Sequence, residues 1–166
     1  TNIKLADTRK TTPGLRIFEK YAFKCGGGVN HRMGLYDAAM IKENHIAWTD
    51  NLKNAVQKIR LNSPFTTHII IEAENIEQAK EAVLAGADSV LLDELSPEII
   101  KKNVQELREL SINSLQKEVN KNLIIEVSGI NPQEISKYLI KGIDLISTSS
   151  SITKSNWIDL SMRYIN

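Results

Sequence analysis

The sequence has little that would support a disulfide, a cysteine metal cluster or a membrane span. Cysteine occurs once in 166 residues, at Cys25, which excludes an internal disulfide. We expect Cys25 to be a packing or surface residue rather than a nucleophile. No apolar run approaches the roughly 18 residues of a membrane helix, and no signal peptide opens the sequence. These absences favour a cytoplasmic enzyme or binding domain with no membrane partner.

Neither sign of charge is in excess. The chain has 21 basic and 20 acidic residues, a formal net charge of +1, and this balance predicts no nucleic-acid partner. With 42% hydrophobic and 25% charged residues, the composition is typical of a soluble globular protein. The length suits one domain. Any positively charged site must therefore be a local concentration of charge.

Apolar strand patterns alternate with amphipathic helix patterns along the chain. Strands are predicted within residues 3–7, 38–44, 67–74, 87–94, 122–129 and 143–150. Helices are predicted within residues 49–61, 75–86, 96–110, 131–142 and 156–165. Thr49 or Asp50 is the expected N-cap of the first helix, and Gly86 closes the second. The sequence Gly-x-Asp, between a helix and a strand, occurs at residues 86–88 and again at 142–144.

Parallel strands need helical crossovers, so this alternation predicts an α/β fold with a parallel sheet. Our first choice is a TIM-like (β/α) barrel with fewer than eight strands, incomplete at its N-terminus; a doubly wound open sheet is the alternative. Either architecture places function at the carboxyl ends of the strands. Each predicted strand ends in charged or hydroxyl residues: Thr8, Arg9 and Lys10; Lys42, Glu43 and Asn44; Glu72; Asp93; Glu126 and Ser128; and residues 147–151.

Charge divides these candidates into two groups. Four cations, together with His31, form what we call the basic wall: Arg9, Lys10, Arg32 and Lys42. Glu72 and Asp93 form an acidic corner, which suits Mg²⁺ or sugar hydroxyls. The basic wall suits a substrate with several negative charges, and the backbone amides near residues 127–131 and 147–151 could hold a terminal phosphate. The residues therefore predict a phosphorylated polyanion as substrate, with magnesium and without a cysteine or serine nucleophile.

The remaining unusual residues allow more than one interpretation. Glycines 26–28 would let the backbone approach a neighbour closely or adopt positive φ, or they form a flexible loop. His45 is expected to make a structural hydrogen bond, and His68 is given no role. A zinc site from His31, His45 and a carboxylate is a minor alternative, because the spacing matches no common metal motif.

Several long motifs resemble the quinolinate phosphoribosyltransferase family. They are ADTRKTTPGLR (6–16), EKYAFKCGGGVNHRMGLYDAAMIKENH (19–45), EAENIEQAKEA (72–82), AGADSVLLDE (85–94) and EVSGIN (126–131). The resemblance implies that quinolinate and phosphoribosyl pyrophosphate are joined with loss of pyrophosphate and CO₂, giving nicotinate mononucleotide for NAD synthesis. It also implies a two-domain protein, of which residues 1–166 would be the single barrel domain and an N-terminal sandwich domain would be absent.

The resemblance also assigns roles. Thr8, Arg9, Lys10, His31, Arg32 and Lys42 would line the quinolinate and pyrophosphate pocket. Glu72 and Asp93 would face the ribose and Mg²⁺. The 5′-phosphate would lie against Ser128, Gly129 and Ile130 and against Thr148, Ser149 and Ser150. Lys10, Lys42, Glu72 and Asp93 would be catalytic. The family implies a homodimer whose partner's N-terminal portion completes the site.

Three other functions stay open. A related phosphoribosyltransferase could act on another ring acid. A non-catalytic domain could bind a phosphorylated metabolite without turning it over. A Schiff-base aldolase could use Lys10 or Lys42 at a strand end.

Overall fold

The structure is a computed structural model that describes residues 2–49, 51–115, 122–156 and 158–165. Six parallel strands form one sheet in the order β1-β6-β5-β4-β3-β2. The strands are β1 (Lys4–Ala6), β2 (Ala38–Ile41), β3 (His68–Ala73), β4 (Ser89–Asp93), β5 (Ile124–Ser128) and β6 (Leu145–Ser147). The helices are α1 (Arg16–Cys25), α2 (Glu43–Ala47), α3 (Leu52–Asn62), α4 (Ile76–Leu84), α5 (Pro97–Leu115), the 3₁₀ helix η1 (Pro132–Tyr138) and α6 (Ser150–Thr153).

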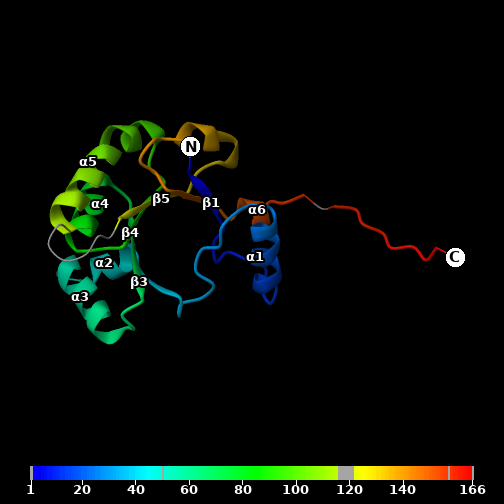
Figure 1. The fold of residues 1–166 in the computed structure, drawn as a ribbon, viewed down its shortest axis with the longest axis horizontal. Helices are drawn as coiled ribbons and strands as arrows, with labels where there is room; N and C mark the ends of the chain where they lie inside the picture. The colour runs from blue at the N-terminus through cyan, green and yellow to red at the C-terminus, as the bar shows by residue number, and fades with distance from the viewer. Residues whose placement is uncertain (1, 50, 116–121, 157, 166) are drawn as a thin grey trace.

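The sheet is the wall of a barrel that is open between β1 and β2. The strand order is cyclic, and Figure 1 shows the strands along an arc with α3, α4 and α5 on its outer side. A doubly wound sheet would carry helices on both faces, so this arrangement confirms the predicted parallel α/β barrel type. On the open side, Val29 forms an isolated parallel bridge to Ala6. Residues after α1 thus extend the β1 edge.

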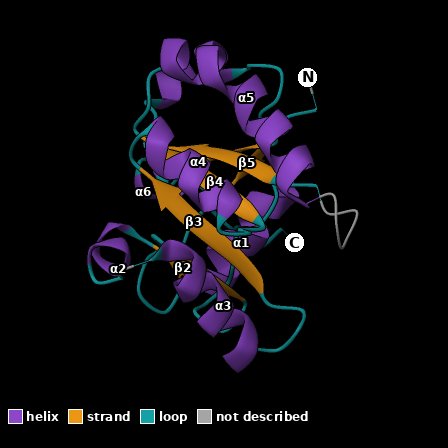
Figure 2. Cartoon of the chain, turned by 90° about the vertical axis from the view of Figure 1, so that its left-hand side faces the viewer, coloured by secondary structure: helices purple, strands orange, loops and turns teal. Residues whose placement is uncertain are grey.

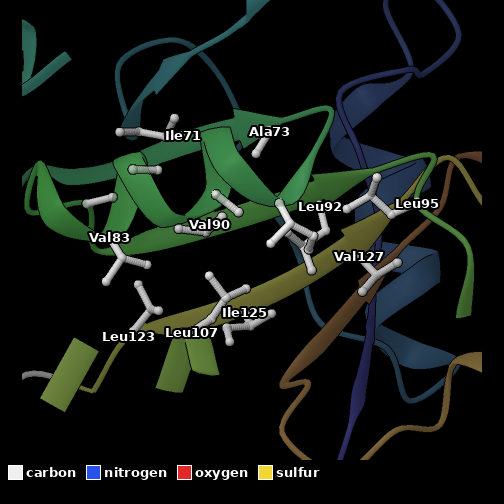
Figure 3. Close-up of a cluster of buried hydrophobic side chains, with 14 of the residues drawn as sticks. Ile71, Ala73, Val83, Val90, Leu92, Leu95, Leu107, Leu123, Ile125 and Val127 are labelled. Atoms are coloured by element: carbon white, nitrogen blue, oxygen red, sulfur yellow. The ribbon is translucent and has the colours of Figure 1, made fainter. Parts of the chain in front are cut away.

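Alternation along the strands separates the outer core from the interior of the barrel. α4 packs across β3 and β4 and against α5 (Figure 2). The outward side chains of three strands meet these helices in one buried cluster (Figure 3), which includes Ile71, Ala73, Val90, Leu92, Ile125 and Val127. The intervening side chains point inward, where a smaller apolar cluster forms from Ala38, Ile70, Leu91 and Met40. The polar residues at the strand ends share this inner face.

The repeated Gly-x-Asp sequence makes the same contacts twice at the amino ends of the strands. Asp88 accepts from the Ile69 backbone N–H at 2.7 Å and from Arg60 of α3 at 2.5 Å. Asp144 likewise accepts from the Ile125 backbone N–H at 2.8 Å and from Arg108 of α5. Each arginine also donates to the carbonyl of the motif's glycine. The repeat is therefore a joint between a strand, its preceding turn and an outer helix.

The triple glycine closes α1 rather than lining the polar strand ends. Gly26 is the C-cap of α1, and Gly27 adopts a φ of +93°. A Cβ at Gly28 would lie 2.1 Å from a ring atom of Phe23. Both predicted uses of glycine, positive φ and close approach, are thus confirmed, and the close approach is that of Gly28 to Phe23 of α1.

Most predicted elements are present, and three details were wrong. The N-cap of α3 is Asn51, whose side chain accepts from the Asn54 N–H at 3.2 Å; Thr49 instead donates to the Ile46 carbonyl, and residue 50 lies outside the described residues. Residues 132–138 form a 3₁₀ helix, and residues 158–165 form no helix. As predicted, Gly86 has a positive φ of 88° after α4, and Cys25 is exposed. None of the helices in the described part of the chain has the length and apolar character to span a bilayer.

Candidate active site

One cavity of about 740 Å³ opens at the carboxyl ends of the strands. Every residue that the sequence predicted to bind substrate lines this cavity: Thr8, Arg9, Lys10, His31, Arg32, Lys42, Glu72, Asp93, Ser128, Gly129, Ile130, Thr148, Ser149 and Ser150. They come from both ends of the sequence and from every strand's carboxyl end. The structure thus brings the predicted residues together, while their individual roles stay predictions.

The strand register sets the depth of each side chain in the cavity. Glu72, Leu91 and Glu126 are aligned across β3, β4 and β5. Asp93 and Ser128 are aligned two residues further toward the mouth, and the Ser128 hydroxyl donates to the Asp93 carboxylate. Because Leu91 also belongs to the inner apolar cluster, an apolar side chain separates Glu72 from Glu126 at the deeper level, and Asp93 lies nearer the mouth.

The Arg32 side chain is held by residues of β2, including Ala38 at its amino end. Its Nη1 donates to the Ala38 carbonyl at 2.8 Å, and its Nη2 contacts the Met40 sulfur at 3.4 Å. Burial lowers the pKa of Arg32, the neighbouring charge of Arg9 lowers it further, and Glu72 acts in the opposite direction. Two guanidinium groups that repel each other across a cavity favour an anion between them.

Lys42 and Glu72 connect the basic wall to the acidic corner. The Lys42 Nζ donates to Glu72 at 2.6 Å. Burial raises the pKa of Glu72, and the hydrogen bond and charge of Lys42 only partly oppose that shift. At the same turn the His45 Nδ1 accepts from the Lys42 backbone N–H at 3.1 Å. This confirms the structural hydrogen bond predicted for His45.

The raised pKa of Glu72 predicts a specific pH dependence of stability. A carboxyl that holds its proton more tightly in the folded state stabilises the fold at low pH, and this contribution disappears as pH rises through the folded pKa. The variant Glu72→Gln cannot titrate at this position. We therefore expect wild type to lose stability relative to Glu72→Gln as the pH rises above the ordinary Glu pKa of about 4, measured by urea unfolding. A difference that moves the other way would show that Lys42, not burial, dominates.

The His31 ring is oriented by contacts at both of its nitrogens. Its Nδ1 accepts from the Arg32 backbone N–H at 2.8 Å, so the ring proton lies on Nε2. That Nε2 faces Glu126 Oε2 at 3.3 Å. Glu126 is 2% exposed, and its Oε1 has no hydrogen-bond partner among the described residues. The ring contributes shape and a directed hydrogen bond, and the basic wall owes its charge to Arg9, Lys10, Arg32 and Lys42.

Glu126 is the principal residue that was not predicted to contact substrate. The sequence places it at a strand end, and its position two residues before Ser128 puts it on the same inner face, so alternation was a sufficient signal. Asn131 and Ser147 also line the cavity and lie in the two segments predicted to hold a phosphate, whereas Met40, Leu91, Glu94, Pro132 and Lys154 were not predicted. Lys154 caps the short helix α6, and no pattern in the sequence points it toward the cavity.

Two loops form the side of the cavity near β5 and β6. Gly129 has a φ of +71°, and a Cβ there would lie 2.5 Å from Glu94 Cγ and 3.0 Å from the Glu94 backbone nitrogen. In the other loop, the Thr148 hydroxyl contacts Ser150 Oγ and accepts from the Ser150 backbone N–H at 3.2 Å. Side-chain hydroxyls, backbone amides and a position that only glycine can occupy therefore lie together where a phosphate was predicted to bind.

The donor set limits what metal the cavity could hold. Across residues 2–49, 51–115, 122–156 and 158–165, no group of three or more His, Cys, Asp or Glu side chains is arranged to bind a metal ion. The zinc alternative with His31, His45 and a carboxylate is therefore wrong for the described residues. Glu72 and Asp93 nonetheless project into one cavity from neighbouring strands. This pair fits Mg²⁺, which commonly takes one or two carboxylates and completes its shell with water and substrate phosphates.

Together, the open parallel sheet and the charged cavity at its strand ends define a (β/α)-barrel domain with a polar site at the carboxyl ends of its strands. The family model described as "Quinolinate phosphoribosyl transferase, C-terminal domain" matches residues 1–163. The chain therefore belongs to this family.

Individual relatives agree with the family model. The chain is 42% identical over 161 residues to a probable nicotinate-nucleotide pyrophosphorylase [carboxylating] of Methanothermobacter thermautotrophicus, covering 96% of this chain and 55% of that protein. It is 38% identical to the Synechocystis protein of the same name, covering 98% and 52%. The crystal structure of NadC from Streptococcus pyogenes superposes with a TM-score of 0.85 at 38% identity, covering 98% and 53%. The chain thus spans about half the length of the relatives that it matches.

Proposed function

We propose that this chain is the barrel of a nicotinate-nucleotide pyrophosphorylase (carboxylating), a pentosyltransferase. In the proposed reaction, quinolinate and phosphoribosyl pyrophosphate give nicotinate mononucleotide, pyrophosphate and CO₂, a step of NAD biosynthesis. The observation that carries the proposal is a single cavity in which Arg9, Lys10, Arg32 and Lys42 share walls with Glu72 and Asp93. One side suits a dicarboxylate and the other suits a ribose with its phosphates.

The chemistry follows from where the charges lie. The basic wall neutralises the two carboxylates of quinolinate and stabilises the negative charge that develops on pyrophosphate as the C1–O bond breaks. The attached ribose leaves the pyridine nitrogen positively charged, which favours loss of the adjacent carboxylate as CO₂. Lys10 and Lys42 are the proposed catalytic cations, and Glu72 and Asp93 the proposed ribose ligands.

Magnesium and the phosphate loops complete the proposed substrate site. Glu72 and Asp93 would hold Mg²⁺ together with oxygens of the sugar phosphate, which supplies charge neutralisation for the pyrophosphate. The 5′-phosphate would lie against Ser128, Gly129 and Ile130 and against Thr148, Ser149 and Ser150. The single-domain boundary at residues 1–166, a cytoplasmic location and a homodimer whose partner completes the site remain part of the proposal.

Calorimetric titration tests this function directly. Quinolinate, nicotinate and phosphoribosyl pyrophosphate with Mg²⁺ are each titrated into the chain. We expect the dicarboxylate quinolinate to bind at least about tenfold more tightly than nicotinate, because two carboxylates engage two arginines. We expect phosphoribosyl pyrophosphate to bind only weakly without Mg²⁺.

The other functions give different titration results. Sugar phosphate binding without quinolinate binding would favour a related transferase that uses another ring acid, or an acid pocket that a partner completes. Tight binding of both ligands with no product formed by a dimer carrying both domains would favour a non-catalytic binding domain. Binding of neither ligand would contradict the proposal.

A further inference from the structure

Helix α1 carries two cations, Arg16 and Lys20, that reach the two loops holding Arg9, Lys10 and Arg32. Residues four apart lie on one helix face, so Arg16 and Lys20 point in the same general direction. Neither residue lines the cavity. Their contacts are with backbone carbonyls, the Thr11 hydroxyl and a buried carboxylate, so their effect on the site is exerted through the loops that they hold.

Lys20 is the more deeply buried of the two. Its side chain is 1% exposed and pairs with Asp7, whose side chain is 0% exposed. The Lys20 Nζ also donates to the His31 carbonyl at 2.9 Å. Asp7 in turn accepts from the His31 backbone N–H at 2.8 Å and from Asn30 Nδ2 at 2.6 Å. Both polar groups of the His31 backbone are therefore bound by one ion pair.

Arg16 joins the same two loops nearer the mouth of the cavity. Its Nη2 donates to the Arg9 carbonyl at 3.3 Å, and its Nη1 donates to the Met33 carbonyl at 3.2 Å. Its Nε donates to the Thr11 hydroxyl at 3.1 Å. Residues 9–11 and 31–33 are thus linked through a helix that itself stays outside the cavity.

We propose that Asp7 and Lys20 are positioning residues that set the placement of Arg32 and its neighbour His31 for the acid substrate. The proposal rests on the proposed function, because it names the acid as quinolinate. A buried ion pair seldom stabilises a fold more than apolar residues of the same volume would. Here the pair instead fixes the backbone of His31, next to Arg32. Asp7 also directly precedes the cavity residues Thr8, Arg9 and Lys10 in the sequence.

The test removes both charges together. Single substitutions would leave one buried charge unpaired and could prevent folding, whereas Asp7→Asn/Lys20→Met removes the pair and keeps similar volumes. Lys24→Met, on the exposed part of the same helix, is the matched control. For each protein we measure the dissociation constants of quinolinate and of phosphoribosyl pyrophosphate with Mg²⁺. We also measure hydrogen exchange of the His31 amide without ligand.

We expect the double variant to fold and to bind quinolinate about tenfold more weakly, since a displaced cation loses a charge-assisted hydrogen bond. Sugar phosphate binding should change less than about twofold. The His31 amide should exchange faster, because a neutral amide oxygen replaces its charged acceptor and the Lys20 bond to the His31 carbonyl is lost. Lys24→Met should match wild type throughout. Equal loss of both ligands would indicate general damage and overturn the specific role, as would unchanged quinolinate binding with unchanged exchange.

Two further outcomes are separable. If wild type binds neither quinolinate nor phosphoribosyl pyrophosphate, the proposed function fails, but His31 exchange in the double variant still shows whether the ion pair holds that backbone. If the double variant does not fold, Asn30→Ala keeps the ion pair and removes one bond to Asp7. It is then expected to accelerate His31 exchange and weaken quinolinate binding, and no change in either measurement would overturn the proposal.

Discussion

Asp88→Ala is expected to lower the free energy of unfolding by about 3 kcal/mol, the upper end of the range for leaving a buried hydrogen-bond donor without its acceptor. The Asp88 side chain is 2% exposed, and its loss leaves Arg60 and the Ile69 backbone N–H without this acceptor. Urea denaturation followed by circular dichroism measures the change. Because Asp88 lies at the amino ends of the strands, the substitution should leave ligand affinity in the folded protein unchanged.

Asp144→Ala is the matched control, because it removes the same group from the second copy of the motif. The Asp144 side chain is 45% exposed, so water can replace part of what is lost, and we expect roughly 1 kcal/mol. The exposed pair of Lys80 and Glu106, 2.6 Å apart, gives a lower reference; Glu106→Gln should change stability by less than about 0.5 kcal/mol. Equal losses at Asp88 and Asp144 would show that burial does not set the difference.

Arg32→Lys is expected to weaken quinolinate binding about 100-fold, within the range for truncating one partner of a buried charged pair. The Arg32 guanidinium donates to the Ala38 carbonyl and still has further N–H groups for a carboxylate. A lysine ammonium is a compact point charge without this planar fork. Calorimetric titration of quinolinate into the folded variant measures the effect.

The control for this prediction makes the same substitution, arginine to lysine, at a position outside the cavity. Arg163 is exposed and does not line the site, so Arg163→Lys should bind quinolinate as wild type does. Retention of quinolinate affinity in Arg32→Lys would mean that charge alone, rather than guanidinium geometry, holds the acid. The role proposed for the Arg32 guanidinium would then be wrong.

The sequence was sufficient to place the site because strand ends are informative in parallel α/β folds. Lys42, Glu72, Asp93 and Ser128 each end a strand, and a parallel sheet must bring such residues to one edge. The positions of helices and strands could be predicted from hydrophobic periodicity and from helix-terminating residues such as Gly86. The sequence predicted a barrel that is incomplete at its N-terminus, but no strand's own pattern locates the opening between β1 and β2.

The failed predictions have local causes. In the segment after Lys154, Ile158, Leu160, Met162 and Tyr164 alternate with polar residues, a period of two that is typical of a strand rather than a helix. These side chains are all exposed in the structure. The orientation of the His31 ring could not be predicted either, because the sequence does not reveal that the Arg32 N–H occupies Nδ1.

The two Gly-x-Asp joints lie at the end of the barrel opposite the cavity. The four strands β3 to β6 are therefore held together at their amino ends, while their carboxyl ends carry the polar groups of the cavity. Sequence change at the cavity rim need not weaken the joints, and change at the joints need not alter the ligand that is bound. A barrel divided in this way can acquire a new substrate preference without first having to become more stable.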